Sequence, residues 1–435
     1  MRFFVLLLSL IAAAPAAAQL SGEEQAMVSA VDADRGHVED FLERFVNQNS
    51  GSLNLEGVRA AAEIVRPEFE ALGFDVEWVD MTETGRAGHL VMTHKGSGKG
   101  KRLLMIGHLD TVFEPGSGFD GFTRDPKDAN RATGPGIGDN KGGVAVILAS
   151  LRAMASAGTL DGADIKVVLT GDEERSGSPI AIARRDLIDA GKWADVALGF
   201  EGLVSENGED FGTIARRSSS SWTLRTTGTQ AHSSGIFGDP GYGAIYEMVR
   251  ILDAWRADLR EPNLTYNVGF IGGGTTADMD AAGLSASSSG KTNIISQTAV
   301  ARGDLRSLTR EQDERARKRM AEIVALHLPG TSAELEWEEG GYPPMSPRPE
   351  NLELLKEFSA TSVDLGMGPL GVWDPARRGA ADISFVADDV DAALAGLGAD
   401  GSGAHAPGEA IDLSSIPKQA KRVAVFMTRL SRQPR

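Results

Sequence analysis

The chain has 435 residues, of which 41% are hydrophobic and 24% charged, and it contains no cysteine. These proportions are typical of a globular protein, and the length predicts two domains rather than one. The formal charge of −17 argues against nucleic acid and anionic membranes as partners, because both would repel an acidic surface. Without thiols, a metal ion can be held only by histidine and carboxylate side chains.

Residues 1–18 have the pattern of a secretion signal. A positive start at Arg2 precedes an apolar run, and the small residues Ala16 to Ala18 stand before Gln19. The apolar run is shorter than the roughly 20 residues that a membrane-spanning helix needs. We therefore expect this segment to be removed, leaving a periplasmic or secreted protein with no membrane anchor.

The first half of the chain alternates predicted strands with predicted helices. Residues 103–107 form a continuous apolar run, which is typical of a strand buried on both faces. The alternation predicts an α/β fold, with a mostly parallel sheet covered by helices on both sides. The expected helices are residues 23–45, 58–72 and 141–155, and the expected strands are residues 74–79, 89–93, 103–107, 165–170 and 196–200.

A different pattern begins near Arg216 and predicts a second domain over residues 216–329. Its order of strand, helix, two strands and helix is typical of a small α+β sandwich with one open sheet face. The Gly-, Ser-, Thr- and Ala-rich residues 272–292 predict a long flexible loop within it. Because residues 330–435 return to mixed α/β, we predict that this domain is inserted into a first domain formed by residues 19–215 and 330–435. The expected elements of the insertion are strands 220–226, 264–270 and 299–305 and helices 242–255 and 311–326.

His108 and Asp110 directly follow a buried strand, at the edge of an α/β sheet where ligands bind. Side chains two residues apart in an extended segment point the same way, so Asp110 could orient the imidazole of His108 for a metal. An ordinary hydrogen-bonded histidine remains the simpler interpretation of this motif alone.

Three carboxylates occur in glycine-rich or strand-end contexts. Asp139 is flanked by glycines just before a helix, where capping of that helix is the simpler role. Glu173 and Glu174 follow a buried strand, and their like charges would repel unless a metal relieved them. One of the two could then bind metal while the other faces the reacting water, although an acidic surface loop is the common alternative.

Glu201 follows a further buried strand, and His405 lies in a late loop between glycines. Neither residue would be informative alone. Placed at successive strand ends of one sheet, however, these histidines and carboxylates can converge. Two histidines and three carboxylates suit a pair of divalent ions with one bridging carboxylate.

Taken in order, these motifs resemble the glutamate carboxypeptidase-like branch of the M20 zinc metallopeptidases, which includes aminoacylases and succinyl-diaminopimelate desuccinylases. The resemblance extends from about Asn47 through Ile416. It implies two divalent ions per chain, zinc or alternatively cobalt, and an inserted dimerisation domain. One ion would be held by His108, Asp139 and Glu201 and the other by Asp139, Glu174 and His405, with Glu173 as the general base.

The resemblance also bears on the substrate. It implies a homodimer in which His232 reaches the active site of the partner subunit, and in which Asn293 and Arg306 bind a substrate carboxylate. A planar guanidinium suits that task, although a structural salt bridge is the alternative role for Arg306. The chain departs from the family pattern at Ser296, where proline is usual, and in its Arg-Gly-Ala-Ala-Asp segment at residues 378–382.

The predicted function is hydrolysis of an amide or peptide bond next to a free carboxylate, in a small peptide or an N-acyl amino acid. Asp110 and His232 are expected to assist Glu173 in catalysis. An N-acyl-amino-acid deacylase of the same fold is the main alternative. A periplasmic binding protein that has lost catalysis is a second alternative, but the complete ligand set and the base argue against it.

Overall fold

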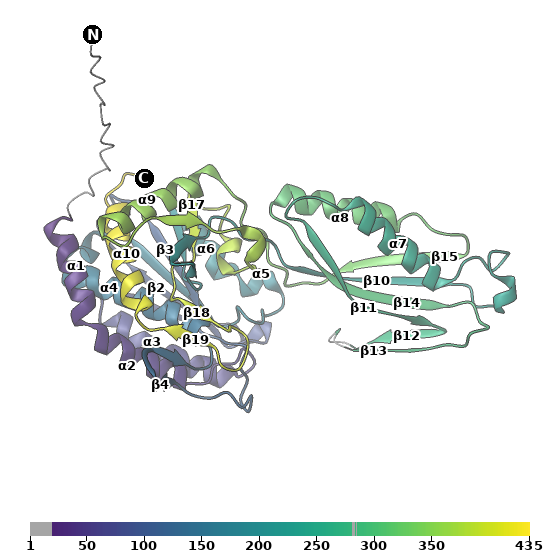
Figure 1. Cartoon of the computed structure of the whole chain (residues 1–435), viewed down its shortest axis with the longest axis horizontal. Helices are drawn as coiled ribbons and strands as arrows, with labels where there is room; N and C mark the ends of the chain where they lie inside the picture. The colour runs from purple at the N-terminus through teal and green to yellow at the C-terminus, as the bar shows by residue number, and fades with distance from the viewer. Residues whose placement is uncertain (1–19, 281–282, 284) are drawn as a thin grey trace, which may run out of the picture.

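The structure is a computed structural model and describes residues 20–280, 283 and 285–435. The predicted signal segment, residues 1–18, lies outside the described residues. Figure 1 shows an α/β body that carries the C-terminus and an elongated extension beside it. The chain leaves the body before Ser220 and returns to it after Trp337, as expected for an insertion. Within the described ranges, no helix has the length and apolar character needed to cross a membrane.

A six-stranded sheet in the order β1-β2-β6-β3-β7-β17 forms the centre of the body. β3 pairs in parallel with β6 and β7, and β7 with β17, whereas β2 is antiparallel to both its neighbours. The prediction of a mostly parallel α/β sheet is therefore confirmed. The strands are β1 (Asp75–Asp80), β2 (Gly88–His94), β3 (Leu103–His108), β6 (Ile165–Thr170), β7 (Val196–Gly199) and β17 (Ala392–Ala395).

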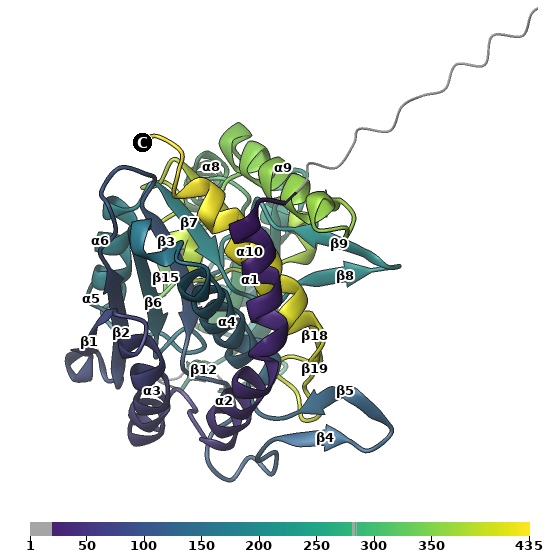
Figure 2. The ribbon, with the colours of Figure 1, turned by 90° about the vertical axis from the view of Figure 1, so that its left-hand side faces the viewer.

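Both faces of this sheet are buried, because alternate residues of β3 enter different hydrophobic cores. Leu103 and Met105 belong to one core, and Leu104 and Ile106 to the other. Figure 2 shows α1, α4 and α10 together on one side of the sheet. The helices are α1 (Gly22–Ala33), α2 (Arg35–Asn47), α3 (Leu55–Glu70), α4 (Gly142–Ser156), α5 (Ile180–Ala183), α6 (Arg185–Trp193), α9 (Pro349–Asp364) and α10 (Ser415–Leu430).

The single helix predicted over residues 23–45 is two helices. Asp34 ends α1 and begins α2, and its carboxylate accepts hydrogen bonds from Arg152 at 2.5 and 2.8 Å. Asp34 and Gly36 are both poor helix formers, so the break falls where the helix is weakest.

Short strands at the rim of the body bring distant loops together. Ala410 of β19 pairs with Thr133 of β5, which places the loop containing His405 against the glycine-rich segment containing Asp139. These rim strands are β4 (Thr123–Asp125), β5 (Asp128–Thr133), β8 (Val204–Glu206), β9 (Glu209–Gly212), β16 (Leu370–Val372), β18 (Gly401–Ser402) and β19 (Ala410–Asp412).

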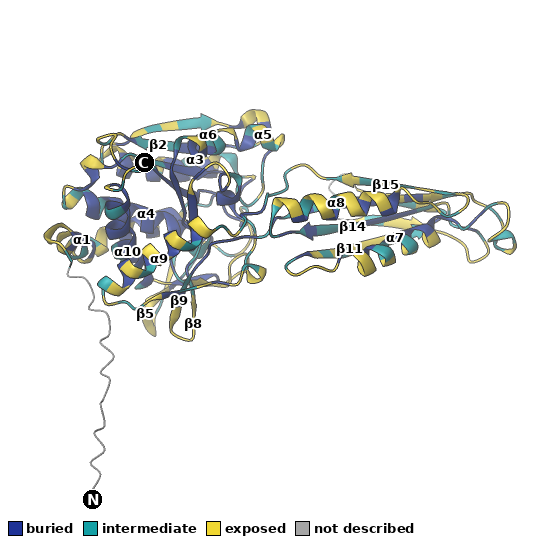
Figure 3. Cartoon of the chain, turned by 90° about the horizontal axis from the view of Figure 1, so that it is seen from above, coloured by how far each residue is buried: buried dark blue, intermediate teal, exposed yellow. Residues whose placement is uncertain are grey.

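The extension is a four-stranded sheet in the order β11-β14-β10-β15, with two helices on one face. Trp222 and Trp255 meet edge to face in its core, with ring centroids 5.0 Å apart. Figure 3 shows the buried residues of the extension gathered where its helices meet its sheet. Its elements are β10 (Ser220–Gly228), α7 (Ala244–Asp258), β11 (Thr265–Gly274), β14 (Thr298–Arg306), α8 (Arg310–Val324) and β15 (Thr331–Trp337).

Two details of the predicted extension need correction. Its boundary at residue 329 is too early, because β15 pairs with β10 and continues the sheet to Trp337. Residues 272–292 are not one long loop: β11 runs to Gly274, and β12 (Thr276–Met279) pairs with β13 (Ala286–Ser289). The small side chains of this hairpin give it the composition of a linker, which is why a loop was predicted. Backbone hydrogen bonds between the two strands hold it in place.

A buried ionic network ties the body to the segment that returns from the extension. The guanidinium of Arg184 donates to Asp172 at 2.5 Å, to Asp382 at 2.9 Å and to the hydroxyl of Tyr342 at 2.8 Å. Arg184 is fully buried, and Tyr342 lies in the returning segment, where its backbone pairs with Ser219.

Replacing Arg184 with alanine should lower the free energy of unfolding by about 3 kcal/mol or more, because it leaves buried carboxylates without their cation. Arg185→Ala is the matched control, since Arg185 is half-exposed and its ion pairs with Asp186 and Glu83 are long. Urea unfolding followed by circular dichroism measures both. Equal midpoints for the two variants would contradict this role.

Candidate metal centre

Three neighbouring strands end at the same edge of the central sheet and carry the predicted site residues. His108 is the last residue of β3, Glu173 and Glu174 follow β6, and Glu201 follows β7. Because β6, β3 and β7 are parallel neighbours, their carboxyl ends converge where ligands bind in such sheets.

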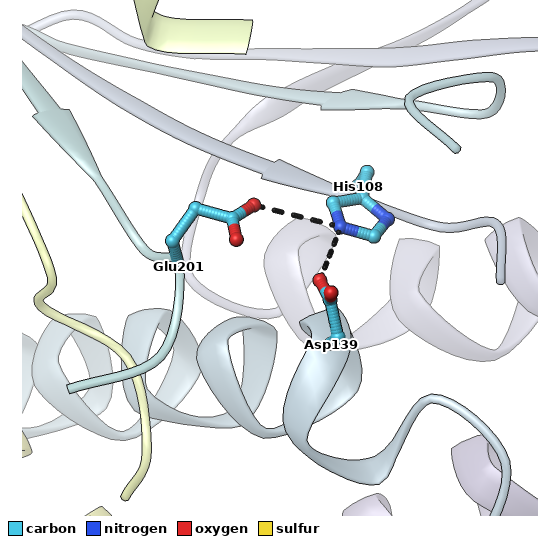
Figure 4. A group of neighbouring side chains, drawn as sticks. All are labelled: His108, Asp139 and Glu201. Carbon is cyan, nitrogen blue, oxygen red and sulfur yellow. Dashed lines mark hydrogen bonds and ion pairs between the residues drawn. The ribbon is translucent and has the colours of Figure 1, made fainter. Parts of the chain in front are cut away.

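Asp139 stands between two histidines, and each of its carboxylate oxygens contacts one of them. Oδ1 lies 3.1 Å from Nε2 of His108, and Oδ2 lies 3.0 Å from Nε2 of His405. Glu201 lies 3.6 Å from Nε2 of His108, and Glu174 lies 3.1 Å from Nε2 of His405. Figure 4 shows the carboxylates of Asp139 and Glu201 facing the imidazole of His108. Two three-residue groups thus share Asp139, and the ligand atoms within each lie within 4.8 Å of one another.

This arrangement brings together all five residues that the sequence predicts as metal ligands, in the same two groups. It also excludes the simpler role of Asp139 as a helix cap. α4 begins at Gly142, its N-cap is Lys141, and the carboxylate of Asp139 contacts imidazoles instead.

The charges and hydrogen bonds of the centre suit cations. Hydrogen bonds to Asp139 and Glu174 raise the pKa of His405 to about 11. Burial alone would lower the pKa of His108, but hydrogen bonds to Asp110, Asp139 and Glu201 raise it well above its ordinary value. Burial raises the pKa of Glu174 to about 7, and its buried Oε1 has no hydrogen-bond partner in the described part of the chain. Divalent ions would take the place of these protons.

Glu409 holds the backbone around Asp139. Its carboxylate accepts hydrogen bonds from the amides of Gly138 at 2.7 Å, Asp139 at 2.9 Å and Gly136 at 3.2 Å. Gly136 has a φ of 69°, a left-handed conformation that favours glycine. No role was predicted for Glu409, although its position four residues after His405 and next to a glycine was a usable signal.

Asp110 positions both the paired glutamates and the imidazole of His108. Its carboxylate accepts the backbone amides of Glu173 at 3.0 Å and Glu174 at 3.1 Å, and the hydroxyl of Ser52 at 2.6 Å. Nδ1 of His108 lies 3.0 Å from the carbonyl oxygen of Asp110 and 3.4 Å from its carboxylate. Main chain and side chain of Asp110 therefore both orient His108.

Glu173 lies beside the metal ligands, where it is half-buried among other carboxylates. Burial raises its pKa well above the ordinary value, Glu201 and Asp382 act in the same direction, and His108 acts in the opposite one. The hydroxyl of Tyr342 donates to the carbonyl oxygen of Glu173 at 2.8 Å. A glutamate with a raised pKa is suited to accept and return a proton near neutral pH.

The residues predicted to contact substrate lie elsewhere. His232 and Asn293 are adjacent, since the amide of Ser233 donates to the carbonyl of Asn293 at 2.9 Å. His232 follows β10 and Asn293 precedes β14, so both lie at the end of the extension far from the body, and the nine residues of β10 span roughly 30 Å. Neither residue takes part in the hydrogen bonds and ion pairs of the metal centre among the described residues.

Arg306 ends β14 at the opposite end of the extension, near the body. Its Nε donates to Asp304 at 2.8 Å, as a structural salt bridge would. Burial lowers the pKa of Arg217, and the charge of Arg306 contributes to this shift, which places the two guanidiniums near each other.

A mostly parallel α/β sheet that carries two ligand groups sharing one carboxylate, with a glutamate beside them, is typical of a metal-dependent hydrolase. Residues 104–429 match the model of Peptidase family M20/M25/M40, and the chain belongs to this family. The resemblance seen in the sequence is therefore confirmed.

Two curated relatives have names that describe amide hydrolases. Carboxypeptidase G2 of a Pseudomonas species is 28% identical over 382 residues, which cover 87% of this chain and 85% of that protein. Succinyl-diaminopimelate desuccinylase of Rhodospirillum centenum is 28% identical over 182 residues, which cover 40% of this chain and 46% of that protein.

Solved structures share the fold across nearly the whole chain. Aminopeptidase PepT of Bacillus cereus is 18% identical with a TM-score of 0.70, and the match covers 92% of this chain and 99% of that one. A dinuclear metal-binding peptidase of family M20 from Bacillus subtilis is 14% identical with a TM-score of 0.61, over 92% and 98% of the two chains.

Metal binding should release protons and strengthen as the pH rises. His405, with a pKa of about 11, carries a proton near neutral pH that a metal must displace, and Glu174 loses its own through about pH 7. Calorimetric titration of the metal-free protein with zinc, in buffers of different ionisation enthalpy, measures the release. We expect at least one proton per chain and an affinity that rises from about pH 6 to about pH 9. A heat independent of the buffer would contradict this expectation.

Proposed function

We propose that the protein is an exported di-zinc hydrolase that cleaves an amide or peptide bond next to a free carboxylate. The observation that carries the proposal is the Asp139 carboxylate shared between two three-residue ligand groups, with Glu173 beside them. The relative named as a carboxypeptidase, aligned over most of both chains, supports this reaction class.

Zinc is proposed because imidazole and carboxylate are ligands that it favours, with cobalt as the alternative. His108, Asp139 and Glu201 would hold one ion, and Asp139, Glu174 and His405 the other. Two ions bound there would polarise the scissile carbonyl and lower the pKa of the attacking water.

Glu173 would take the proton of that water on its carboxylate and return it to the departing nitrogen. Asp110 assists indirectly, because its hydrogen bond to the amide of Glu173 fixes the backbone from which the base projects. Arg306 would bind the substrate carboxylate and so fix which amide is cut, after its fork turns from Asp304 toward the substrate. Asn293 would join this contact from the partner subunit.

We further propose a homodimer formed through the extension. Helix α7 exposes Ile245, Tyr246 and Val249, and the neighbouring edge strand β11 exposes Ile271. Large apolar side chains gathered on one surface are typical of protein interfaces. His232 is distant from the metal centre of its own chain. In such a dimer it would lie at the metal centre of the partner subunit, where it would donate a hydrogen bond to the oxyanion.

An N-acyl-amino-acid deacylase is the second candidate, and the partial match to a desuccinylase favours it. Both reactions cut an amide beside a carboxylate. The export proposal rests on the sequence of residues 1–18.

Activity of the zinc-loaded protein on peptides with different C-terminal residues, compared with N-acyl amino acids, tests the proposal and separates the two candidates. Glu173→Gln should keep its zinc and lose activity by about two to four orders of magnitude, because the transferred proton has no acceptor. Glu43→Gln, on the exposed face of α2, is the control. Turnover of Glu173→Gln near the control rate would remove Glu173 as the base.

Hybrid dimers test the role of His232. His232→Ala and Glu173→Gln should each be inactive alone, and mixing them after subunit exchange should restore up to about a quarter of the normal activity, since a hybrid has one intact site. His232→Ala mixed with the double variant His232→Ala/Glu173→Gln is the matched control and should restore nothing. No recovery after demonstrated exchange would count against catalysis across subunits.

A further inference from the structure

An arginine lies beside the metal centre, in the segment where the chain departs from the family pattern. Arg378 lines a cavity of about 170 Å³ together with Asp139 and Glu201. Burial lowers its pKa to about 10, the guanidinium of Arg216 acts in the same direction, and Glu201 and Asp139 act against it. Arg378 is therefore a charged group on the wall of the site.

The surrounding segment is fastened so that this side chain stays at the cavity. Arg217 donates to the carbonyl of Ala376 at 2.9 Å, and Arg216 to that of Gly379 at 3.0 Å. Arg377 points outward, where it pairs with Glu206 at 2.8 Å and stacks on the ring of Trp373. Arg378 itself donates to the carbonyl of Gly202, directly after Glu201.

The two guanidiniums have donors that lack acceptors. Nε of Arg378, and Nε and Nη2 of Arg216, are buried without a hydrogen-bond partner among the residues that the structure describes. Arg216 is 2% exposed. Buried donors without acceptors are costly, and an Arg fork is matched by the two oxygens of a carboxylate. Arg306, by comparison, already contacts the carboxylate of Asp304.

We propose that Arg378, with Arg216 behind it, binds a carboxylate group of the substrate at the wall of the metal centre. This inference rests on the proposed function and adds a specificity-determining residue to it. A carboxylate bound in this cavity would lie beside Asp139 and Glu201, two of the residues that would hold an ion with His108. Preferred substrates would then carry a carboxylate close to the scissile amide. Arg378 of the body would bind a carboxylate in addition to the contact proposed for Arg306 of the extension.

Direct binding to the zinc-loaded protein tests the subsite without turnover. The probe is glutarate, a dicarboxylate that contains no amide to hydrolyse, and calorimetry gives its affinity. Arg378→Ala should weaken glutarate binding by roughly ten- to a hundredfold, the range for a hydrogen bond to a charged group. Arg377→Ala, the adjacent outward-facing arginine, should bind as the wild type does. Arg378→Lys keeps the charge and should fall between the two, because it lacks the planar fork.

Kinetics provide the second measurement. The ratio of kcat/KM for a substrate with a free carboxylate to kcat/KM for its carboxamide counterpart should fall by at least about tenfold in Arg378→Ala, with zinc content unchanged. Normal binding of glutarate by Arg378→Ala would overturn the proposal. Loss of zinc, or an equal slowing of both substrates, would also overturn it, since Arg378 would then only balance the charge of Glu201.

The two proposals fail in different ways. A protein that hydrolyses no amide, yet binds glutarate through Arg378, would retain the subsite and lose the proposed function. If both Arg378 variants hydrolysed amides with the same preference for a free carboxylate over a carboxamide as the wild type, the proposed function would stand and the subsite would be ruled out.

Discussion

The concentration of negative charge at one sheet edge is the constraint on which the rest of the structure depends. Asp139, Glu174 and Glu201 lie together with Glu173, and two imidazoles hold them there through the two oxygens of Asp139. Like charges in a buried cleft repel, so the protein fixes each group through its backbone. Glu409 binds the amides around Asp139, and Asp110 binds those of the paired glutamates. The centre is thus preorganised for divalent cations.

The buried ionic network around Arg184 connects the metal centre to the extension. Tyr342 lies where the chain returns to the body, and its hydroxyl contacts the carbonyl of Glu173 and the guanidinium of Arg184. Arg184 in turn binds Asp172, next to Glu173, and Asp382. The segment that returns from the extension therefore contacts the backbone of the proposed base through one hydroxyl.

The sequence predicted the parts of the site that depend on local rules. Apolar runs identified β3, β6 and β7, and residues directly after such strands must meet at one edge, which placed His108 and Glu201. The glycine context of Asp139 favoured a helix cap when taken alone, and the pairing of β19 with β5 shows why Asp139 meets His405 instead. Glu409 and Arg184 act through contacts between distant segments, which periodicity cannot show. The β12–β13 hairpin was missed because backbone pairing, rather than an apolar pattern, stabilises it.

Two arginines, Arg306 and Arg378, are candidates for binding the substrate carboxylate. Arg306 lies on the extension and its fork is occupied by Asp304, so its contact with substrate requires a rearrangement. Arg378 lies on the body, in the cavity of the metal centre, with a buried donor that has no acceptor in the described chain. A group that is preorganised and unsatisfied loses less free energy on binding than one that must first exchange partners. The family pattern indicates Arg306, whereas the cavity and the unpaired donor favour Arg378 for the proposed contact with a substrate carboxylate.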